Sequence, residues 1–168
     1  MSIPVAVREA APADIPAMAA VAERSYRGAF AAILEPEVLA ARDAPFFAER
    51  FRGSWPRMRV AEHAGAVIGF SLVTDAHLDM LFVDPAAAGT GAGGALLRFV
   101  EREGCTSLEC FRDNHPARAF YERQGWTLTR GYERDFLGRS RAFVRYEKPV
   151  SPGSAARAQS SPASRAAR

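Results

Sequence analysis

Hydrophobic residues in the first third of the chain recur at the three- and four-residue spacing of α-helices. A helix is expected to begin after Asp14, which can cap it, and a short strand over residues 3–8 precedes it. One or two further helices are expected within residues 36–53, with a break near Asp43 and Pro45. This part of the chain is therefore predicted to be mainly helical.

After Pro56 the pattern changes to short runs rich in β-branched and aromatic residues. Residues 58–63, 66–74 and 77–83 are strand-like, and links of two residues separate them. The first link, Ala64-Gly65, has the composition of a tight hairpin turn. Three sequential strands with such short links predict an antiparallel meander.

The rest of the chain alternates helices and strands. A helix is expected to end at Gly104, and the strand after it is expected to run parallel to the strand ending at Val83, because a helix connects the two. The elements expected here are a strand over 106–111, a helix over 116–124, and strands over 126–132 and 141–147. The fold class is therefore predicted as α+β, with one mixed, mostly antiparallel sheet of about seven strands and about four flanking helices.

Composition sets the domain boundaries. The chain has 168 residues, enough for one domain, which we place at residues 1–150. Residues 151–168 contain only Ser, Pro, Gly, Ala, Arg and Gln, so we expect a disordered tail. The tail's three arginines account for the net charge of +3, which leaves residues 1–150 formally neutral and gives no indication of a nucleic-acid partner.

Several other classes of protein are not indicated. No apolar run is long enough to span a membrane, and the first residues lack the order of a signal peptide. Cys105 and Cys110 are too few for a disulfide framework, so we expect two reduced thiols in a cytoplasmic protein. His63, His77 and His115 lack metal-ligand spacing, and no metal is expected.

The most informative segment is the glycine-rich stretch over residues 89–94, which contains four glycines. It follows the strand ending at Val83 and a turn containing Pro85, and it precedes an apolar-periodic helix. A strand, a glycine-rich loop and a helix start in this order direct free backbone N–H groups and the helix dipole at one point. The sequence therefore predicts a phosphate-binding site.

The identity of the phosphate ligand has several interpretations. Residues 89–94 match the dinucleotide pattern G-x-G-x-x-G, and Glu109 follows at the distance of a ribose-binding acid. The intervening residues 84–88, the antiparallel strands upstream and the short chain remaining downstream oppose that interpretation. A P-loop is excluded because no Gly-Lys follows, Lys148 being the only lysine. A merely flexible turn is disfavoured because glycines at a helix start are entropically costly.

Two segments resemble the GNAT (Gcn5-related) N-acetyltransferase family. Residues 83–93 (VDPAAAGTGAG) are similar to its acyl-CoA-binding motif, in which a Val-x-Pro strand end precedes a Q/R-x-x-G-x-G/A loop. Residues 108–114 (LECFRDN) and 119–126 (AFYERQGW) resemble the family's next strand, its Asn and its Ala-x-Tyr-Glu-x-x-Gly-Phe/Trp helix end. The order of elements also matches, from about Val5 to Pro149.

The resemblance implies a GNAT-like fold and transfer of an acetyl group from acetyl-CoA to a primary amine, directly in a ternary complex. It implies the following cofactor-binding residues: Leu81, Phe82 and Val83 for the pantetheine arm, Gly89, Thr90, Gly91, Ala92, Gly93 and Gly94 for the pyrophosphate, and Asn114. Ala88 departs from the motif, since the family usually has Gln or Arg there. Loss of that side-chain donor is expected to weaken coenzyme binding by about 1 kcal/mol.

The resemblance also implies catalytic residues. Tyr121 is the candidate general acid, because a phenol is protonated at neutral pH and can donate to the departing thiolate. Helical spacing alone would instead make it a core aromatic. Glu109 is the first candidate base, twelve residues before Tyr121, and Asp79 is the second. An acceptor that is already neutral needs no enzyme base.

The acceptor stays open at this point. It is an amine-bearing small molecule, a protein N-terminus or a lysine, and residues 26–55 and 132–141 are expected to form its pocket. No membrane partner is expected, and both a monomer and a homodimer are compatible with the sequence. A different class of function, a non-catalytic acyl-CoA-binding or sensing module, is kept because of Ala88 and the uncertain base.

Overall fold

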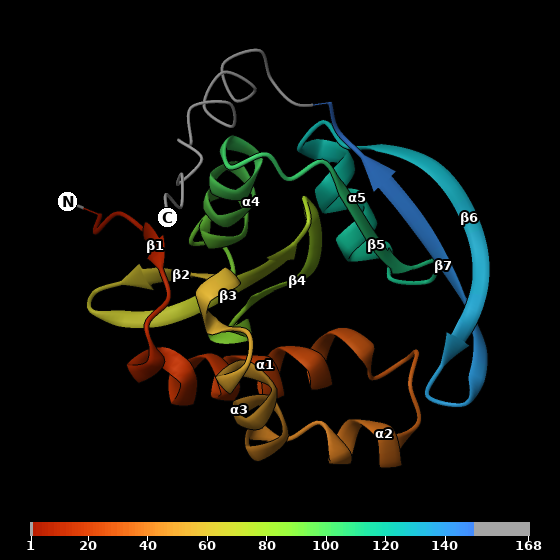
Figure 1. Cartoon of the computed structure of the whole chain (residues 1–168), viewed down its shortest axis with the longest axis horizontal. Helices are drawn as coiled ribbons and strands as arrows, with labels where there is room; N and C mark the ends of the chain where they lie inside the picture. The colour runs from red at the N-terminus through yellow and green to blue at the C-terminus, as the bar shows by residue number, and fades with distance from the viewer. Residues whose placement is uncertain (1, 150–168) are drawn as a thin grey trace, which may run out of the picture.

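Seven strands form one sheet in the order β1-β2-β3-β4-β5-β7-β6 in the computed structural model, which describes residues 2–149 (Figure 1). The strands are β1 Ala6–Glu9, β2 Met58–His63, β3 Ala66–Thr74, β4 His77–Val83, β5 Ser107–Phe111, β6 Thr127–Phe136 and β7 Arg139–Glu147. Every neighbouring pair is antiparallel except β4 and β5, which are parallel. The predicted meander, the parallel pair and the α+β class are confirmed.

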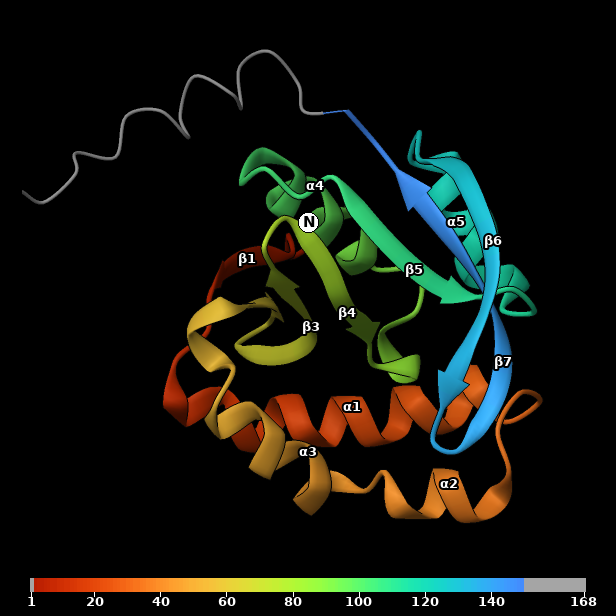
Figure 2. The same ribbon diagram turned by 45° about the vertical axis from the view of Figure 1, so that its right-hand side comes forward.

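Helices cover both faces of the sheet (Figure 2). One face carries α1 Ile15–Phe30, α2 Pro36–Ala41 and α3 Ala44–Arg52, and the other carries α4 Ala92–Arg102 and α5 His115–Arg123. Three single 3₁₀ turns, η1 Pro12–Asp14, η2 Trp55–Arg57 and η3 Pro85–Ala87, lie between them. Each layer has its own buried core, the larger one around Phe47, Phe51 and Phe70 and the other around Leu97, Leu108 and Tyr146.

The predicted helix boundaries hold for specific local reasons. The Asp43 carboxylate accepts the Phe46 N–H at 3.0 Å and so caps α3 where the break was expected. Asp14 stands at the start of α1, but its carboxylate binds Arg8 at 2.8 Å and the Ala11 N–H at 2.7 Å instead of the helix. It therefore fixes the entry of the chain into α1 rather than capping it.

The last two strands are longer than predicted. β6 and β7 extend to a turn at Leu137 and Gly138, both with positive φ. The sequence does not reveal this extension, because β6 is an edge strand with almost every residue at least partly exposed, so it has no alternating buried pattern. The longer hairpin reaches the α1–α2 connection (Figure 2).

The described residues bear on the expectation about a membrane span but not on the one about the C-terminal tail. Within residues 2–149, no helix is long and apolar enough to cross a membrane. The tail expected to be disordered, residues 151–168, lies outside the described residues.

Candidate active site

The sheet opens between β4 and β5. The two strands pair at only two positions, His77 with Ser107 and Leu78 with Leu108, and then diverge (Figure 2). A β-bulge stands at the same place, because the β3–β4 register skips Asp79. A bulge bends and twists its strand, so the bulge at Asp79 accounts for the early end of the pairing.

The divergence leaves backbone groups of β4 without a strand partner. The Asp84 N–H binds the Ile68 carbonyl at 2.7 Å, which fixes the phase of the antiparallel hydrogen bonds between β3 and β4. In that phase the N–H and C=O groups of Leu81 and the N–H of Val83 point away from β3, toward the gap. The gap is therefore lined by backbone donors and acceptors that an extended, amide-containing ligand can pair with.

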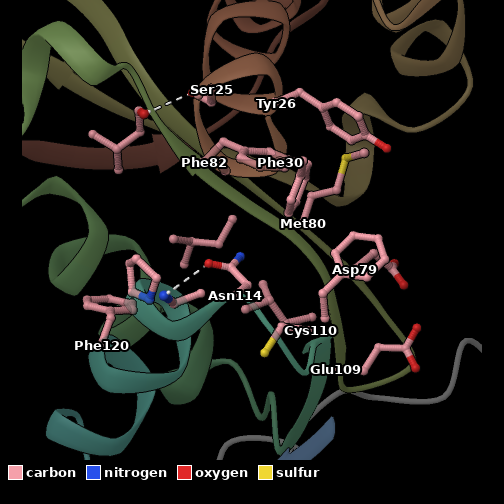
Figure 3. A pocket seen from close by; sticks show the side chains of 18 of the residues that line it. Ser25, Tyr26, Phe30, Asp79, Met80, Phe82, Glu109, Cys110, Asn114 and Phe120 are labelled. Atoms are coloured by element: carbon pink, nitrogen blue, oxygen red, sulfur yellow. Dashed lines mark hydrogen bonds between the residues drawn. The ribbon is translucent and has the colours of Figure 1, made fainter. Parts of the chain in front are cut away.

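A cavity of about 930 Å³ occupies the gap and continues on both sides of it. Figure 3 shows Phe120 near one end, Asp79 and Glu109 at the opposite side, and Asn114 and Cys110 between them. Residues of α1, α3, β4, β5, α4, α5 and the β6–β7 hairpin all contribute to the wall. The cavity therefore joins the glycine-rich loop to the part of the chain expected to bind the acceptor.

The turn before the glycine-rich loop is fixed from two directions. The Asp84 carboxylate pairs with Arg24 of α1 at 2.5 Å and accepts the Ala86 N–H at 3.0 Å. The hydrogen bond from Arg24 holds the pKa of Asp84 below its usual value, despite partial burial. Ser25 donates to the Val83 carbonyl at 2.9 Å. The Val-Asp-Pro segment thus positions the loop against α1.

The loop leaves several N–H groups unused. Gly91, at the N-cap of α4, has φ +84°, and Gly89 has φ +82°, a region that other residues rarely occupy. The Thr90 hydroxyl donates to the Ala87 carbonyl at 2.7 Å and lies 3.4 Å from the Ala92 nitrogen. Within the described chain the N–H groups of Gly89, Gly91, Gly93 and Gly94 have no acceptor. Such a set at a helix N-terminus fits a pyrophosphate without side-chain help.

An arginine that sequence reasoning missed lies beside this loop. A Cβ built on Gly94 would stand 3.0 Å from Nη1 of Arg98, so the guanidinium folds back over the first turn of α4. Arg98 is exposed and has no ion-pair partner among the described residues. The sequence could have indicated Arg98 by its position, because a residue four places after Gly94 lies on the same face of the predicted helix.

Tyr121 lies in the core but borders the cavity. It is 8% exposed, and its ring packs against Phe120, Trp126 and Tyr146. Its hydroxyl has no hydrogen-bond partner within residues 2–149. Burial raises the pKa of Tyr121, so the phenol stays protonated throughout the neutral range. A protonated, unpartnered donor at a cavity wall is available to a bound ligand.

Glu109 is held by β6, the far edge of the sheet. Its carboxylate accepts hydrogen bonds from the Tyr132 hydroxyl and from Arg134, whose Nε stands 3.0 Å away. Burial raises the pKa of Glu109, but these bonds and the charge of Arg134 outweigh it and leave the pKa below its usual value. Burial, followed by the hydrogen bond to Glu109 and the charge of Glu109, raises the pKa of Tyr132 to about 12, against the charges of Arg134 and Arg130.

Asp79 is exposed at the bulge of β4 and lines the same cavity. It accepts a hydrogen bond from Thr74 at 2.6 Å and has no ion-pair partner among the described residues. The parallel pairing of β4 with β5 brings Asp79 and Glu109 to one side of the cavity (Figure 3).

The remaining polar candidates have structural roles. The Asn114 side chain accepts the Ala117 N–H at 3.3 Å and so caps α5 at the cavity wall. Burial raises the pKa of both Cys105 and Cys110 to about 11, which keeps them as thiols. Within residues 2–149, no group of three or more His, Cys, Asp and Glu side chains is placed to hold a metal ion.

The part of the cavity beside α1 and α3 carries residues without a sequence signal. It is lined by Tyr26, Phe30, Arg42, Phe47, Arg50 and Phe136, which we call the acceptor end. These residues come from α1, the α2–α3 junction, α3 and the β6–β7 hairpin. They fall within or close to the two segments from which the acceptor pocket was expected.

Comparisons with known proteins agree with this geometry. The model of the acetyltransferase (GNAT) domain family matches residues 54–128, which include β4, the glycine-rich loop and α5. The peptidyl-lysine N-acetyltransferase YiaC of Escherichia coli K12 is 38% identical over 71 residues, which span 41% of this chain and 49% of that protein. The chain thus spans about half the length of this curated relative.

Solved structures share the fold over nearly its whole length. A GCN5-related N-acetyltransferase from Rhodopseudomonas palustris is 25% identical with a TM-score of 0.67, covering 88% of this chain and 98% of that one. YjaB from Escherichia coli is 23% identical (TM-score 0.69; 85% and 96% covered). The PaiA N-acetyltransferase from Thermoplasma acidophilum, solved with coenzyme A, is 17% identical (TM-score 0.66; 87% and 100% covered).

Proposed function

Because residues 54–128 match the GNAT acetyltransferase domain family and the fold is shared with GNAT structures, we propose that this chain is a GNAT N-acetyltransferase that transfers the acetyl group of acetyl-CoA to a primary amine in a ternary complex. The observation that carries the proposal is the junction of the β4–β5 gap with the free N–H groups at the start of α4. An amide-rich chain fits the β4–β5 gap, and a pyrophosphate fits the free N–H groups at the start of α4. Acetyl-CoA carries an amide-containing pantetheine arm followed by a pyrophosphate, so one molecule can occupy both parts of the site.

In this proposal the protein binds acetyl-CoA mainly through its backbone. Leu81 and Val83, with Phe82 between them, pair with the pantetheine amides as an added strand would. The loop at residues 89–94 donates its N–H groups to the pyrophosphate. Asn114 lines the cavity where α5 begins, within reach of the same arm. These contacts are made mainly by the backbone, so the site does not depend on the Gln or Arg side chain that Ala88 replaces.

Arg98 is expected to supply the charge that Ala88 lacks. Replacing Arg98 by Gln removes a charge-assisted contact worth about 1.5–3 kcal/mol and should raise the Kd for acetyl-CoA roughly 10- to 100-fold. The measurement is calorimetric titration with acetyl-CoA at fixed salt. Arg52→Gln, at an exposed arginine of α3 paired with Glu49, is the matched control. Equal affinities for all three proteins would show that Arg98 does not contact the coenzyme.

The proposed mechanism places a proton donor and an acceptor on the two sides of the gap. Tyr121 gives its proton to the leaving thiolate, which its raised pKa permits because the phenol is protonated at the start. Glu109 or Asp79 takes the proton of an ammonium acceptor, directly or through water. The buried aromatic wall limits water around the reacting groups.

The pH profile distinguishes the two candidate bases. Arg134 holds the pKa of Glu109 low, so Arg134→Gln should raise that pKa and move the acidic limb of kcat/KM to higher pH. The sign follows from the carboxylate being the active form, which forms only above its pKa. The measurement is kcat/KM against pH for the wild type, Arg134→Gln and Glu109→Gln. If the acidic limb stays in place in both variants, Glu109 is not the base, and Asp79→Asn becomes the variant to measure.

The experiment that tests the function is an acceptor screen with acetyl-CoA. Free CoA thiol and the mass of each product are followed with small amines, amino acids, lysine peptides and peptides with free N-termini. Acetylation of at least one amine is the expected result. Binding of acetyl-CoA with no acetylated product would instead support the non-catalytic binding module.

A further inference from the structure

Two arginines at the acceptor end of the cavity are unpaired. Arg42 and Arg50 both line the wall, and neither forms an ion pair with a carboxylate within residues 2–149. The Arg42 guanidinium lies 4.3 Å from the centroid of the Phe46 ring and also interacts with the Tyr26 hydroxyl, so its contacts are with an aromatic ring and a neutral hydroxyl. Unpaired guanidiniums against an apolar wall are typical of a site for an anionic group.

A buried tyrosine lies close to these charges. Tyr26 is 7% exposed and lines the same end of the cavity. Burial raises the pKa of Tyr26, while the charges of Arg42, Arg50 and Arg141 and a hydrogen bond with Arg42 act in the opposite direction, so three positive charges act on its hydroxyl. Arg141 is neutralised by Glu35 at 2.5 Å, whereas Arg42 and Arg50 are not neutralised. The acceptor end therefore carries an excess of positive charge.

The side of the cavity formed by β4 and β5 carries negatively charged side chains. Asp79 and Glu109 lie there, and only Glu109 is paired with an arginine. The rings of Phe30 and Phe111 line the cavity with centroids 5.2 Å apart, and the Tyr26 ring contacts Phe30 at 4.6 Å between centroids, so a chain of rings leads from β5 to Tyr26. A negative region, an apolar wall and a positive region thus follow one another along the cavity.

Hydrogen bonds and ion pairs connect β7 to the α1–α2 connection close to the acceptor end. Arg141 of β7 donates to the Ile33 carbonyl at 3.1 Å and to Glu35, while Arg139 pairs with Glu35 at 3.0 Å. These bonds join the β6–β7 hairpin to the α1–α2 connection (Figure 2). The Arg141 side chain is only 12% exposed. A junction held by these bonds favours a small acceptor over a polypeptide at this end of the cavity.

From these observations, and resting on the proposed acetyltransferase function, we propose that the acceptor is a small ω-amino acid. Its carboxylate binds Arg42 and Arg50, its methylene chain lies along the Phe30 and Phe111 rings, and its amine reaches the Asp79 and Glu109 side. The amine nitrogen forms the new amide bond with the acetyl carbon, and the carbon–sulfur bond of the thioester breaks. The ammonium loses one proton to the base and a second as the amide forms, while one proton reaches the thiolate, so the products are the N-acetylated acid, free CoA and one released proton.

Matched acceptors test this assignment in the full chain. The acceptor 6-aminohexanoate is compared with hexylamine and with 6-aminohexanamide. Both of these keep the carbon chain and the amine of 6-aminohexanoate but lack its negative charge. We expect kcat/KM with aminohexanoate to be at least about 10-fold higher than with either of the others, since a charge-assisted contact contributes about 1.5–3 kcal/mol. Aminopentylphosphonate has the same methylene chain as aminohexanoate, and equal or better activity with it would overturn the choice of a carboxylate.

Variants assign the effect to residues. Arg50→Met should lower kcat/KM for aminohexanoate about 10-fold and leave hexylamine unchanged, while Arg52→Met should change neither. An equal loss with both acceptors would contradict carboxylate binding by Arg50. Acetylation of lysine peptides but not of amino acids would refute the ω-amino acid and leave the acetyltransferase function standing. If no amine of any kind is acetylated, the proposed function itself fails, and this assignment fails with it.

Discussion

Replacing Tyr121 by phenylalanine is expected to lower kcat roughly 10²- to 10⁴-fold and to leave acetyl-CoA affinity unchanged. The substitution removes one oxygen, the proton donor that the mechanism assigns to the leaving thiolate. The Tyr121 hydroxyl has no hydrogen-bond partner within residues 2–149, so its loss leaves no buried group unsatisfied. Thermal stability should therefore stay close to that of the wild type, and kcat is the quantity that changes.

The control for this prediction is a second buried tyrosine. Tyr146 is fully buried and packs against Tyr121, but its hydroxyl is engaged by Arg118 at 3.1 Å and by Glu122 at 2.8 Å. Tyr146→Phe should cost some stability and leave kcat nearly unchanged. Steady-state kinetics across pH, with saturating acetyl-CoA, measure both variants. Wild-type rates for Tyr121→Phe at every pH would remove Tyr121 from the mechanism.

Replacing Gly91 by valine is expected to weaken acetyl-CoA binding roughly 10²- to 10³-fold, the loss of about two charge-assisted hydrogen bonds. Gly91 has φ +84° at the N-cap of α4, and a β-branched residue is strongly disfavoured there. Valine should force the loop to rearrange, so that the N–H groups of Gly89 and Gly93 no longer converge on one point. Calorimetric titration with acetyl-CoA measures the loss.

Gly91→Asn is the matched variant, because asparagine tolerates the left-handed conformation. A Cβ at this position meets no other atom within 4 Å, so neither side chain is excluded by crowding. Asparagine should therefore retain most of the affinity, and valine should lose it. Equal affinities for the two variants would show that loop conformation does not determine coenzyme binding.

Local signals in the sequence are sufficient for most of the fold. The Ala64-Gly65 link, the Asp43 cap and the glycine at position 104 each act on their own segment, and each ends or turns it where predicted. The Val-Asp-Pro turn and the glycine-rich loop are likewise local. The mixed sheet order also excludes the doubly wound fold that the dinucleotide interpretation required.

Features that depend on distant partners could not be predicted. The gap between β4 and β5 follows from a bulge at Asp79, which has no sequence signature. Glu109 was identified as a candidate base, but its pairing with Arg134 depends on β6 lying two strands away in the sheet. The grouping of Arg42 and Arg50 around Tyr26 similarly depends on how α3 packs against α1.

The decisive experiment is calorimetric titration of the full chain with acetyl-CoA and, separately, with NAD. We expect one acetyl-CoA site per chain, weakened by Gly91→Val and retained in Gly91→Asn, and no binding of NAD. Absence of acetyl-CoA binding, or binding of NAD at the same loop, would refute an acetyl-CoA site at residues 89–94.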